Sequence, residues 1–294
     1  MKRKVNQDNK NIFAIIVLVL LIAYSLSLLL SLYWALLTSF KSRGDFRYNK
    51  LFQFPKEWEW ENFKVVFEQM SVPDTSGRIP RQVFFPEMLW NSIWLPITVT
   101  LVTLLVRVSS AYVLAKYKFR GNEIVYAVVF FAMVIPISNT LPAFLKMLRT
   151  LGIYDKPISI YLMNMNLMDT AFLVLYAGYK NLSWEYAEAA IVEGASHMRI
   201  MFQIMIPLMA PIISTYFLLG VVGMWNDYGT NLQFLRSTPM VSYGLYYYFS
   251  TPTKTFSKPI QLAASVLVTA PMLLLFIMFK DKFMGNLTLG GLKG

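Results

Sequence analysis

The chain has 294 residues, of which 56% are hydrophobic, and its formal net charge at pH 7 is +11. So large an apolar share excludes an ordinary soluble domain and predicts that most of the chain lies in a lipid bilayer. The lack of cysteine excludes disulfides and thiolate metal sites, and the single histidine excludes multi-histidine sites. We therefore expect no metal site and no catalytic residues in this chain. Scattered positive charge indicates contact with anionic membrane lipid rather than with nucleic acid.

The first apolar segment follows a basic N-terminus. Residues 1–11 contain several lysine and arginine side chains, and residues 12–40 carry no charge. An apolar run of this length without a small-residue cleavage site predicts an uncleaved transmembrane helix, with its basic end in the cytoplasm. Residues 41–87 are polar and are expected to form an extracytoplasmic loop, with one short surface helix near Trp60 to Met70.

Five more apolar segments are expected between residues 88 and 285, so the sequence predicts an all-α membrane protein with six transmembrane helices. An even number of spans places both termini on the cytoplasmic side, which the basic loop from Lys116 to Gly121 also favours. The fourth span contains Asn164, Asn166 and Asp169, and a helix interrupted in this way must face protein or water. The expected spans are residues 12–40, 88–115, 124–145, 162–179, 206–225 and 259–279.

Residues 183–203, between the fourth and fifth spans, are polar and rich in small side chains. Ser183 is a good N-cap, and Glu185 in the first turn complements the helix dipole. Gly194 can take the left-handed conformation that ends a helix, and Ser196 can cap a second helix. We expect a helix, a glycine corner and another helix at a membrane surface. Small side chains suit entry into a partner's cleft, although composition alone also permits an interfacial amphipathic helix.

The spacing of Glu188, Ala189 and Ala190 before Gly194 resembles the cytoplasmic EAA loop of binding-protein-dependent ABC importer permeases. Glu193 stands where this family commonly has Asp.

Three further stretches extend the resemblance towards the carbohydrate-uptake group, of which the smaller permease of the maltose importer is an example. They are Tyr117 to Gly121, similar to the loop between spans two and three; Trp225-Asn226-Asp227-Tyr228, similar to a Trp-Asn-aromatic signature; and Gly285 to Gly294, similar to the terminus GxTxGxxKG.

The resemblance implies the type I permease fold, with a cytoplasmic coupling helix between spans four and five. The implied function is ATP-driven import of a sugar or oligosaccharide by alternating access across the bacterial inner membrane. The implied partners are a second permease in a heterodimer, two ATP-binding subunits and an extracytoplasmic solute-binding protein. Because the chain has no glycine-rich loop followed by Lys and Ser or Thr, ATP and Mg are expected to be bound and ATP hydrolysed by those subunits.

The resemblance also implies two contacts with the ATP-binding subunits. The coupling residues would be Glu185, Glu188, Ala189, Ala190, Glu193 and Gly194. Within the tail of residues 286–294, the contacts would be Thr288, Gly290, Gly291 and Lys293. Alternatives from the residues alone are that Glu188 is a solvated first-turn carboxylate and that the tail is a frayed end.

Polar side chains within the spans predict a substrate pathway. If the spans are straight, Asp169 lies roughly 12 Å nearer the outer face than Arg107, at about 1.5 Å rise per residue. We therefore expect Asp169 to contact sugar or water, although an ion pair with Arg107 remains an alternative. Arg107 itself could snorkel to the inner surface or favour acidic sugars such as uronides. The predicted pathway residues are Arg107, Asn164, Asn166, Asp169, Trp225, Asn226, Asp227 and Tyr228.

A different class of protein would use two of the same residues. A self-sufficient secondary transporter or channel would need no ATPase and would use Arg107 and Asp169 as a charge relay. It would leave the loop pattern around Glu188 unexplained.

Overall fold

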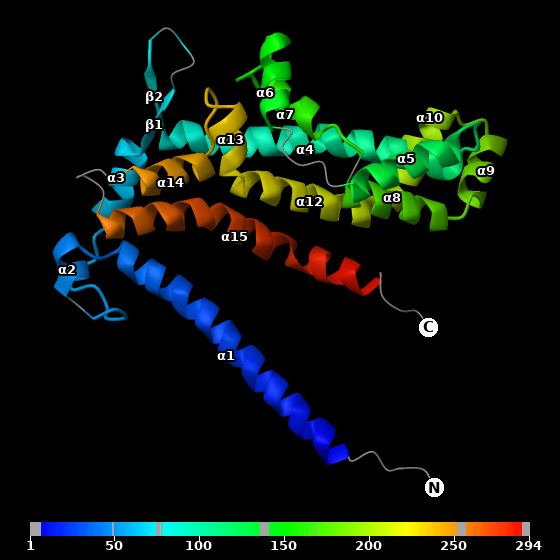
Figure 1. Ribbon diagram of the computed structural model, residues 1–294. Coiled ribbons are helices and arrows are strands. Elements are labelled where there is room, and N and C mark those ends of the chain that lie inside the picture. Colours follow the sequence, from blue (N-terminus) through cyan, green and yellow to red (C-terminus); the bar gives the residue numbers. More distant parts are fainter. Residues whose placement is uncertain are drawn as a thin grey trace. The chain divides into compact units, whose positions relative to one another are not determined.

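The computed structural model is mostly helical (Figure 1) and describes residues 7–48, 50–74, 77, 79–135, 141–167, 169–251 and 257–289, with the backbone alone for residues 7–12 and 280–289. The chain forms two compact units. The first consists of Met1–Met70 and Tyr248–Ala270, and the second of Ser71–Tyr247 and Pro271–Gly294.

The first unit begins with the long helix α1 (Gln7–Ser39), which confirms the predicted first apolar helix. Its side chains from Phe13 to Leu32 are exposed on all sides, as expected for a helix that faces lipid. Two short helices follow, α2 (Arg43–Tyr48) and α3 (Glu61–Gln69). The second of these is the surface helix predicted near Trp60.

Aromatic side chains gather at the end of α1. The ring of Phe40 lies 5.1 Å from that of Trp58, 4.8 Å from that of Trp60 and 4.9 Å from that of Phe63. Trp and Tyr side chains are typical of the level at which a membrane meets water. The cluster therefore agrees with an exit from the bilayer close to Ser39.

The second unit opens with a hairpin that the sequence did not predict. Strand β1 (Ser71–Asp74) pairs antiparallel with β2 (Arg81–Phe84). The Arg81 guanidinium forms ion pairs with two carboxylates. Its Nε lies 3.0 Å from Oδ2 of Asp74, and its Nη2 lies 2.9 Å from Oε1 of Glu87. Hydrogen bonds to these two carboxylates raise the pKa of Arg81 above its usual value. Four-residue strands in a polar loop give too short a pattern to be recognised.

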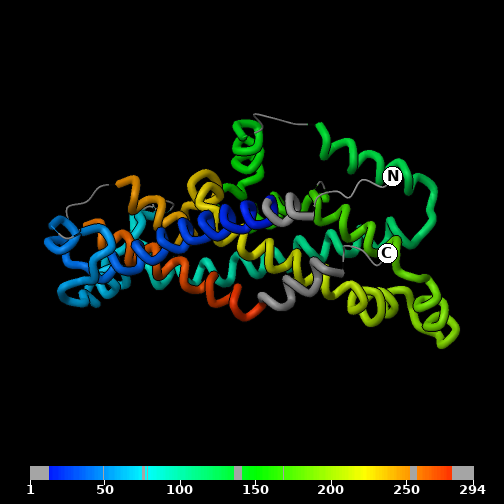
Figure 2. The backbone as a smooth tube through the Cα atoms, turned by 90° about the horizontal axis from the view of Figure 1, so that it is seen from below, coloured from blue at the N-terminus to red at the C-terminus, as the bar shows by residue number. Residues whose placement is uncertain are grey.

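Helix α4 (Phe85–Lys116) is the centre of the second unit and confirms the predicted second span. It packs against α7 (Pro157–Asn164), α8 (Thr170–Asn181) and α12 (Ala210–Asn226), and α4 and α12 lie side by side in both views (Figures 1 and 2). A side chain at Gly220 would collide with Thr100. Glycine at this position therefore allows α12 to approach α4 closely.

The predicted third and fourth spans each consist of two shorter helices. In the expected third span, residues 124–145, prolines at positions 136 and 142 predict a kink or an early stop. Helix α5 (Asn122–Val134) ends before residues 136–140, which lie outside the described residues, and α6 (Leu141–Thr150) begins after them. Likewise α7 and α8 replace a continuous fourth span. The break between them ends at Asp169, whose Oδ1 accepts a hydrogen bond from the Phe172 N–H at 2.9 Å and so starts α8.

The fifth predicted span is sharply bent. The predicted residues 206–225 comprise α11 (Ile206–Leu208) and nearly all of α12. Helix α11 continues from α10 (His197–Ile200) and the π-helical turn η1 (Met201–Met205), and this helical run meets α12 at a bend of 77° between Leu208 and Ala210. Within the described residues, three segments are long and apolar enough to cross a bilayer as single helices: Phe13–Ser39, Phe85–Lys116 and Lys258–Phe279. The bent pair provides a fourth if it counts as one span.

Two expectations about the C-terminal third are corrected. Residues 226–258 join the fifth and sixth expected spans, and their content of Tyr, Thr and Pro predicts a loop. They contain α13 (Tyr228–Phe234) and α14 (Val241–Ser250). The carboxylate of Asp227 starts α13 by accepting from the Thr230 N–H at 3.1 Å. Helix α15 (Lys258–Leu289) continues past the expected end at Phe279, so part of the predicted tail is helical.

Candidate functional site

The loop between α8 and α10 has the predicted helix, corner and helix. Helix α9 (Glu185–Val192) begins just after Ser183, whose Oγ accepts from the Glu185 N–H at 3.2 Å. Gly194 has φ +82°, which confirms its predicted left-handed conformation. The Oγ of Ser196 then accepts from the Arg199 N–H at 3.4 Å and caps α10. We call residues 183–203 the coupling loop.

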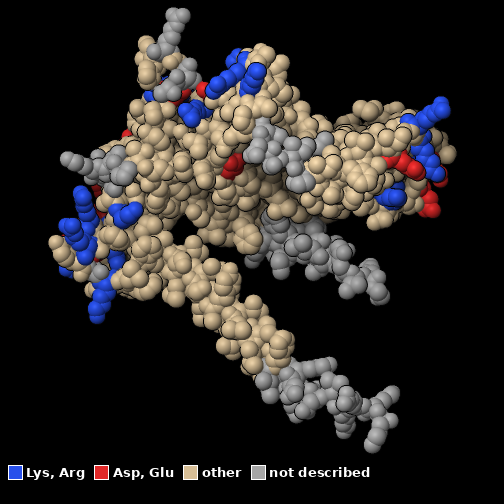
Figure 3. Space-filling view, viewed as in Figure 1, with Lys and Arg blue, Asp and Glu red and all other residues tan. Residues whose placement is uncertain are grey.

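The coupling loop has an outward face and an inward face. Glu185, Glu188, Ala189, Glu193 and Gly194 are exposed. Figure 3 shows acidic and basic side chains gathered at this end of the second unit, over α9 and α10.

The predicted coupling residue Ala190 differs from these five residues. Its side chain is buried, with 8% exposure, and packs with the fully buried Ala187 into the chain's own core. Contact of Ala190 with a partner stays a prediction, and in this chain its side chain faces the core. Period 3.6 places residues 187 and 190 on one side of a helix, but the pattern does not say which side faces the protein.

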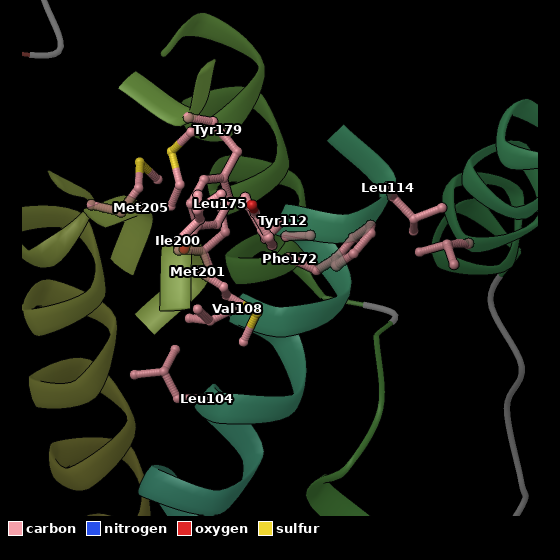
Figure 4. Close-up of a cluster of buried hydrophobic side chains, with 14 of the residues drawn as sticks. Leu104, Val108, Tyr112, Leu114, Phe172, Leu175, Tyr179, Ile200, Met201 and Met205 are labelled. Atoms are coloured by element: carbon pink, nitrogen blue, oxygen red, sulfur yellow. The ribbon is translucent and has the colours of Figure 1, made fainter. Parts of the chain in front are cut away.

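A hydrophobic cluster lies under the inward face (Figure 4). It joins the coupling loop to α4 and α8 and includes the fully buried rings of Phe172 and Tyr179. The rings of Tyr112 and Tyr179 meet edge to face at 5.5 Å. Interiors packed in this way transmit displacement rather than absorb it. The coupling loop is thus mechanically continuous with the ends of α4 and α8.

Tyr117, just after α4, touches both sides of the coupling loop. Its hydroxyl lies 3.0 Å from Nδ1 of His197, at the start of α10, and 3.2 Å from the hydroxyl of Tyr112. Its ring meets that of Trp184, just before α9, edge to face at 5.7 Å. The sequence indicated the stretch around Tyr117 only by resemblance, since contacts between distant segments leave no local pattern.

Lys116 makes a second connection between the same segments. Its Nζ donates to the Leu182 carbonyl oxygen at 2.5 Å, directly after α8. The end of α4 is therefore fixed to the end of α8 where the coupling loop begins.

Two neighbouring alanines provide a matched test of the two faces. Ala190→Leu should lower the free energy of unfolding by about 1–3 kcal/mol, because the core under α9 has no room for added carbons. Ala189→Leu adds the same atoms to the exposed face and should leave stability within about 0.5 kcal/mol. Thermal unfolding of the purified protein in detergent measures both. Equal destabilisation by the two variants would contradict the assignment of the faces.

A cavity of about 320 Å³ lies between α4, the α7–α8 break and α12. Its lining combines apolar, hydroxyl and charged side chains. The lining residues are Val99, Thr100, Thr103, Leu104, Arg107, Asn164, Asp169, Thr170, Ala171, Tyr216, Leu219, Gly220 and Met224.

Arg107 and Asp169 form an ion pair in this cavity, with Nη2 2.8 Å from Oδ2 and side chains that are 16% and 31% exposed. The expected separation along two straight spans is therefore wrong. The chain leaves the helix after Asn164 and re-enters it at Asp169, which places this carboxylate beside α4.

Arg107 also holds the other side of the break. Its Nε donates to the Asn166 carbonyl oxygen and its Nη2 to the Asn164 carbonyl oxygen, both at 3.2 Å. The cation thus lies at the C-terminal end of α7 and the carboxylate at the N-terminal end of α8, where each complements the helix dipole. The amides of Asn164 and Asn166 donate within their own segment, to the Ile160 and Met163 carbonyl oxygens, and Asn164 still lines the cavity. Their role in a substrate pathway stays a prediction.

The other four predicted pathway residues do not line this cavity. Trp225 is buried, and the Asn226 amide donates to the Val222 carbonyl oxygen at 2.9 Å. Asp227 caps α13, and Tyr228 stacks on Tyr246 with ring centroids 4.5 Å apart. Met224, Gly220 and Tyr216, on the cavity side of α12, take their place in the lining. The sequence showed the polar signature but not which face of α12 turns inward.

The remaining predictions concern metals and the tail. In the part of the chain that the structure describes, no three His, Cys, Asp or Glu residues gather so as to hold a metal ion. Thr288 lies in the last turns of α15, where only the backbone is described, and Gly290, Gly291 and Lys293 lie outside the described residues.

Comparison with known proteins supplies the context for this geometry. The family described as "Binding-protein-dependent transport system inner membrane component" matches residues 107–287. The diacetylchitobiose uptake system permease protein of Streptomyces coelicolor is 24% identical over 281 residues, covering 95% of this chain and 88% of the relative. An arabinooligosaccharides transport system permease protein of Halalkalibacterium halodurans is 30% identical over 205 residues, covering 69% and 73%.

One solved structure shares the fold. It is a crystal structure of a bacterial ABC transporter involved in the import of the acidic polysaccharide alginate, with a TM-score of 0.78 and 21% identity, covering 93% of this chain and 97% of that one. This likeness confirms the expected fold of a largely helical importer permease.

Proposed function

The chain belongs to the family of binding-protein-dependent transport system inner membrane components, and we propose that it is the permease subunit of an ATP-driven importer for a sugar or oligosaccharide. The family match includes both the coupling loop and the cavity pair Arg107 and Asp169. Relatives named for uptake of diacetylchitobiose, arabinooligosaccharides and melibiose, raffinose and stachyose support a carbohydrate substrate.

The chain works in an assembly. It pairs with a second permease, receives substrate from an extracytoplasmic solute-binding protein and is driven by two subunits that bind ATP and Mg. It spans the inner membrane with residues 1–11 and 286–294 in the cytoplasm and residues 41–87 outside. The tail contacts the ATP-binding subunits, and the chain itself performs no covalent chemistry.

One arrangement carries this proposal: α4 and α8 each meet the coupling loop at one end, and each also provides one side of the cavity ion pair, Arg107 within α4 and Asp169 at the far end of α8. Lys116 and Tyr117 follow Arg107 along α4, and α8 runs from its cap Asp169 to the Leu182 junction. Helix α8 has 12 residues and is therefore about 18 Å long, at about 1.5 Å per residue. Movement of the coupling loop is therefore transmitted to the cavity through the helices α4 and α8.

ATP-driven closure of the partner subunits pushes on the exposed face of α9, around Glu188 and Ala189. The packed core passes this push to α4 and α8. Closed and open arrangements of the helices around the cavity then alternate, which requires an element with two discrete states rather than a flexible linker. The bend near Met209 and the α7–α8 break are two places beside the cavity where the chain departs from straight helices.

The cavity suits a neutral sugar unit. Its volume of about 320 Å³ is at the low end of the roughly 300–1,000 Å³ range of ligand pockets. Asp169 already neutralises Arg107, so a substrate carboxylate would have to displace an internal one. Hydroxyl groups need no counter-charge and can donate to the exposed part of the Asp169 carboxylate.

Reconstitution into liposomes tests the proposal. The complete assembly should take up labelled oligosaccharide only with ATP on the cytoplasmic side and solute-binding protein on the other side, whereas the purified chain alone should transport none. The control is the same assembly with ATP replaced by a non-hydrolysable analogue. Uptake by the lone chain down an ion gradient would overturn the proposal and favour the secondary transporter with an Arg107–Asp169 relay.

A further inference from the structure

A basic pocket lies in the first unit, between α2 and the start of α15. Its volume is about 580 Å³. Arg43 and Arg47 come from α2, and Lys258 is the first residue of α15. The other described lining residues are Gly44, Phe46, Tyr48, Ser257 and Pro259, and none of these carries a carboxylate.

The positive charge in this pocket has no ion-pair partner in the part of the unit that the structure describes. Among the described residues, no Asp or Glu oxygen lies within ion-pair distance of Arg43, Arg47 or Lys258. Lys258 Nζ does donate to the Gln261 side-chain oxygen at 2.9 Å and lies 5.8 Å from the Phe249 ring centre, both of which are neutral partners.

The acidic side chains near α2 line a different pocket. Asp45, Glu57 and Glu59 border that second pocket, and the Asp45 carboxylate accepts from the Lys56 N–H at 3.1 Å. Figure 3 shows the Lys and Arg side chains gathered over α2. The short helix thus separates an acidic side from a basic side, and the basic side is open to a ligand of negative charge.

The depth of the pocket identifies the ligand class. The apolar segment of α1 ends at Ser39, and that of α15 begins at Lys258, so the pocket lies where both segments meet the membrane surface. The aromatic cluster of Phe40, Trp58 and Trp60 lies at the same end of α1. Arg and Lys side chains at this level lie among lipid phosphates.

We propose that Arg43, Arg47 and Lys258 bind the phosphate headgroup of an anionic phospholipid. The proposed topology assigns this lipid to the outer leaflet, but the pocket itself follows from the first unit alone. The bound headgroup joins α2 to the start of α15 and holds the two ends together. An acidic surface of the solute-binding protein is the competing occupant, and the location at the membrane surface favours lipid.

Native mass spectrometry of the assembled transporter in detergent tests the proposal, with phosphatidylglycerol and phosphatidylcholine added as probes. The wild type should bind phosphatidylglycerol in preference. The variant Arg43→Gln/Arg47→Gln/Lys258→Gln should bind it at least ten-fold more weakly, because each cation near an anionic headgroup strengthens binding about five-fold. The charge-retaining variant Arg43→Lys/Arg47→Lys/Lys258→Arg should bind as the wild type does.

The matched control removes the same charge elsewhere. Lys50, Lys64 and Lys146 are exposed and lie outside the pocket, and their replacement by Gln should leave phosphatidylglycerol binding unchanged. Equal loss in this control, or wild-type binding by the pocket variant, would overturn the proposal. The proposal would also be overturned if the pocket variant still binds phosphatidylglycerol but binds the solute-binding protein more weakly in phosphatidylcholine nanodiscs. That result would assign the pocket to protein docking. Displacement of the lipid by millimolar inorganic phosphate would also overturn it, as a site for free phosphate.

Discussion

Gly194→Val should reduce ATP-coupled uptake by roughly ten-fold or more while the protein stays in the membrane. Gly194 has φ +82°, and a β-branched residue adopts this left-handed conformation only at a cost of at least about 1–2 kcal/mol. The corner therefore opens, and α9 turns its exposed face away from the ATP-binding subunits. The measurement is uptake and ATPase activity in proteoliposomes at equal protein content.

Gly152 provides the matched control. It also has positive φ, +66°, and a side chain at either glycine would meet no atom within 4 Å, so the backbone penalty is shared. Gly152 lies in the turn after α6, away from the coupling loop, and Gly152→Val should keep uptake close to the wild-type rate. Gly194→Asn should retain much of the activity, because Asn tolerates the left-handed conformation. Normal uptake and ATPase association in Gly194→Val would count against the role of the corner.

Breaking the cavity ion pair should both destabilise the protein and stop transport. Arg107→Gln or Asp169→Asn leaves one charge unpaired, and we expect each to lower the free energy of unfolding by about 1–3 kcal/mol, less than for a fully buried pair because both side chains retain some exposure. The double variant should lose less than the sum of the two. Unfolding of the purified chain in detergent measures this coupling. Additive losses would contradict a direct pair.

Asp227→Asn is the control for Asp169→Asn. Both carboxylates start a helix by accepting a backbone hydrogen bond, but only Asp169 pairs with an arginine. Asn is as good a cap as Asp. Asp227→Asn should therefore preserve uptake, whereas Asp169→Asn should abolish it with basal ATPase activity intact. If Asp227→Asn is equally inactive, the pathway extends beyond the cavity described between α4 and α12.

The same variants report the charge of the substrate. With Arg107 released from its internal partner, the Asp169→Asn assembly should bind an acidic oligosaccharide in preference to a neutral one, even though it does not transport either. A wild-type preference for the acidic sugar would contradict the neutral cavity.

Local patterns predicted the parts of the site that depend on neighbouring residues. Ser183, Gly194 and Ser196 act as caps and corner within a few residues of their positions, and the structure confirms all three. The predictions that failed depend on packing between distant segments. The predicted straight fourth span would have separated Arg107 from Asp169. The break before α8 brings the two side chains together.

The contact between Tyr117 and His197 was equally inaccessible from sequence. The two residues are 80 positions apart, and neither belongs to a periodic pattern that predicts the other. The inward direction of the Ala190 side chain could not be predicted from the sequence for a related reason. Alanine is small enough for an interface and for a tight core, so its identity does not distinguish them.

The Asp169 carboxylate serves two structures with its two oxygens: one starts α8, and the other pairs with Arg107. Sequence drift at this position is consequently restricted in a particular way. A lineage that loses the arginine is free to lose the charge at position 169 but still needs an oxygen on a short side chain, so Asn, Ser and Thr are open to it while Ala and Leu are not. A lengthening to Glu keeps the charge and moves both oxygens away from the backbone of α8. Selection for transport and selection for a helix start thus act on one residue through separate atoms.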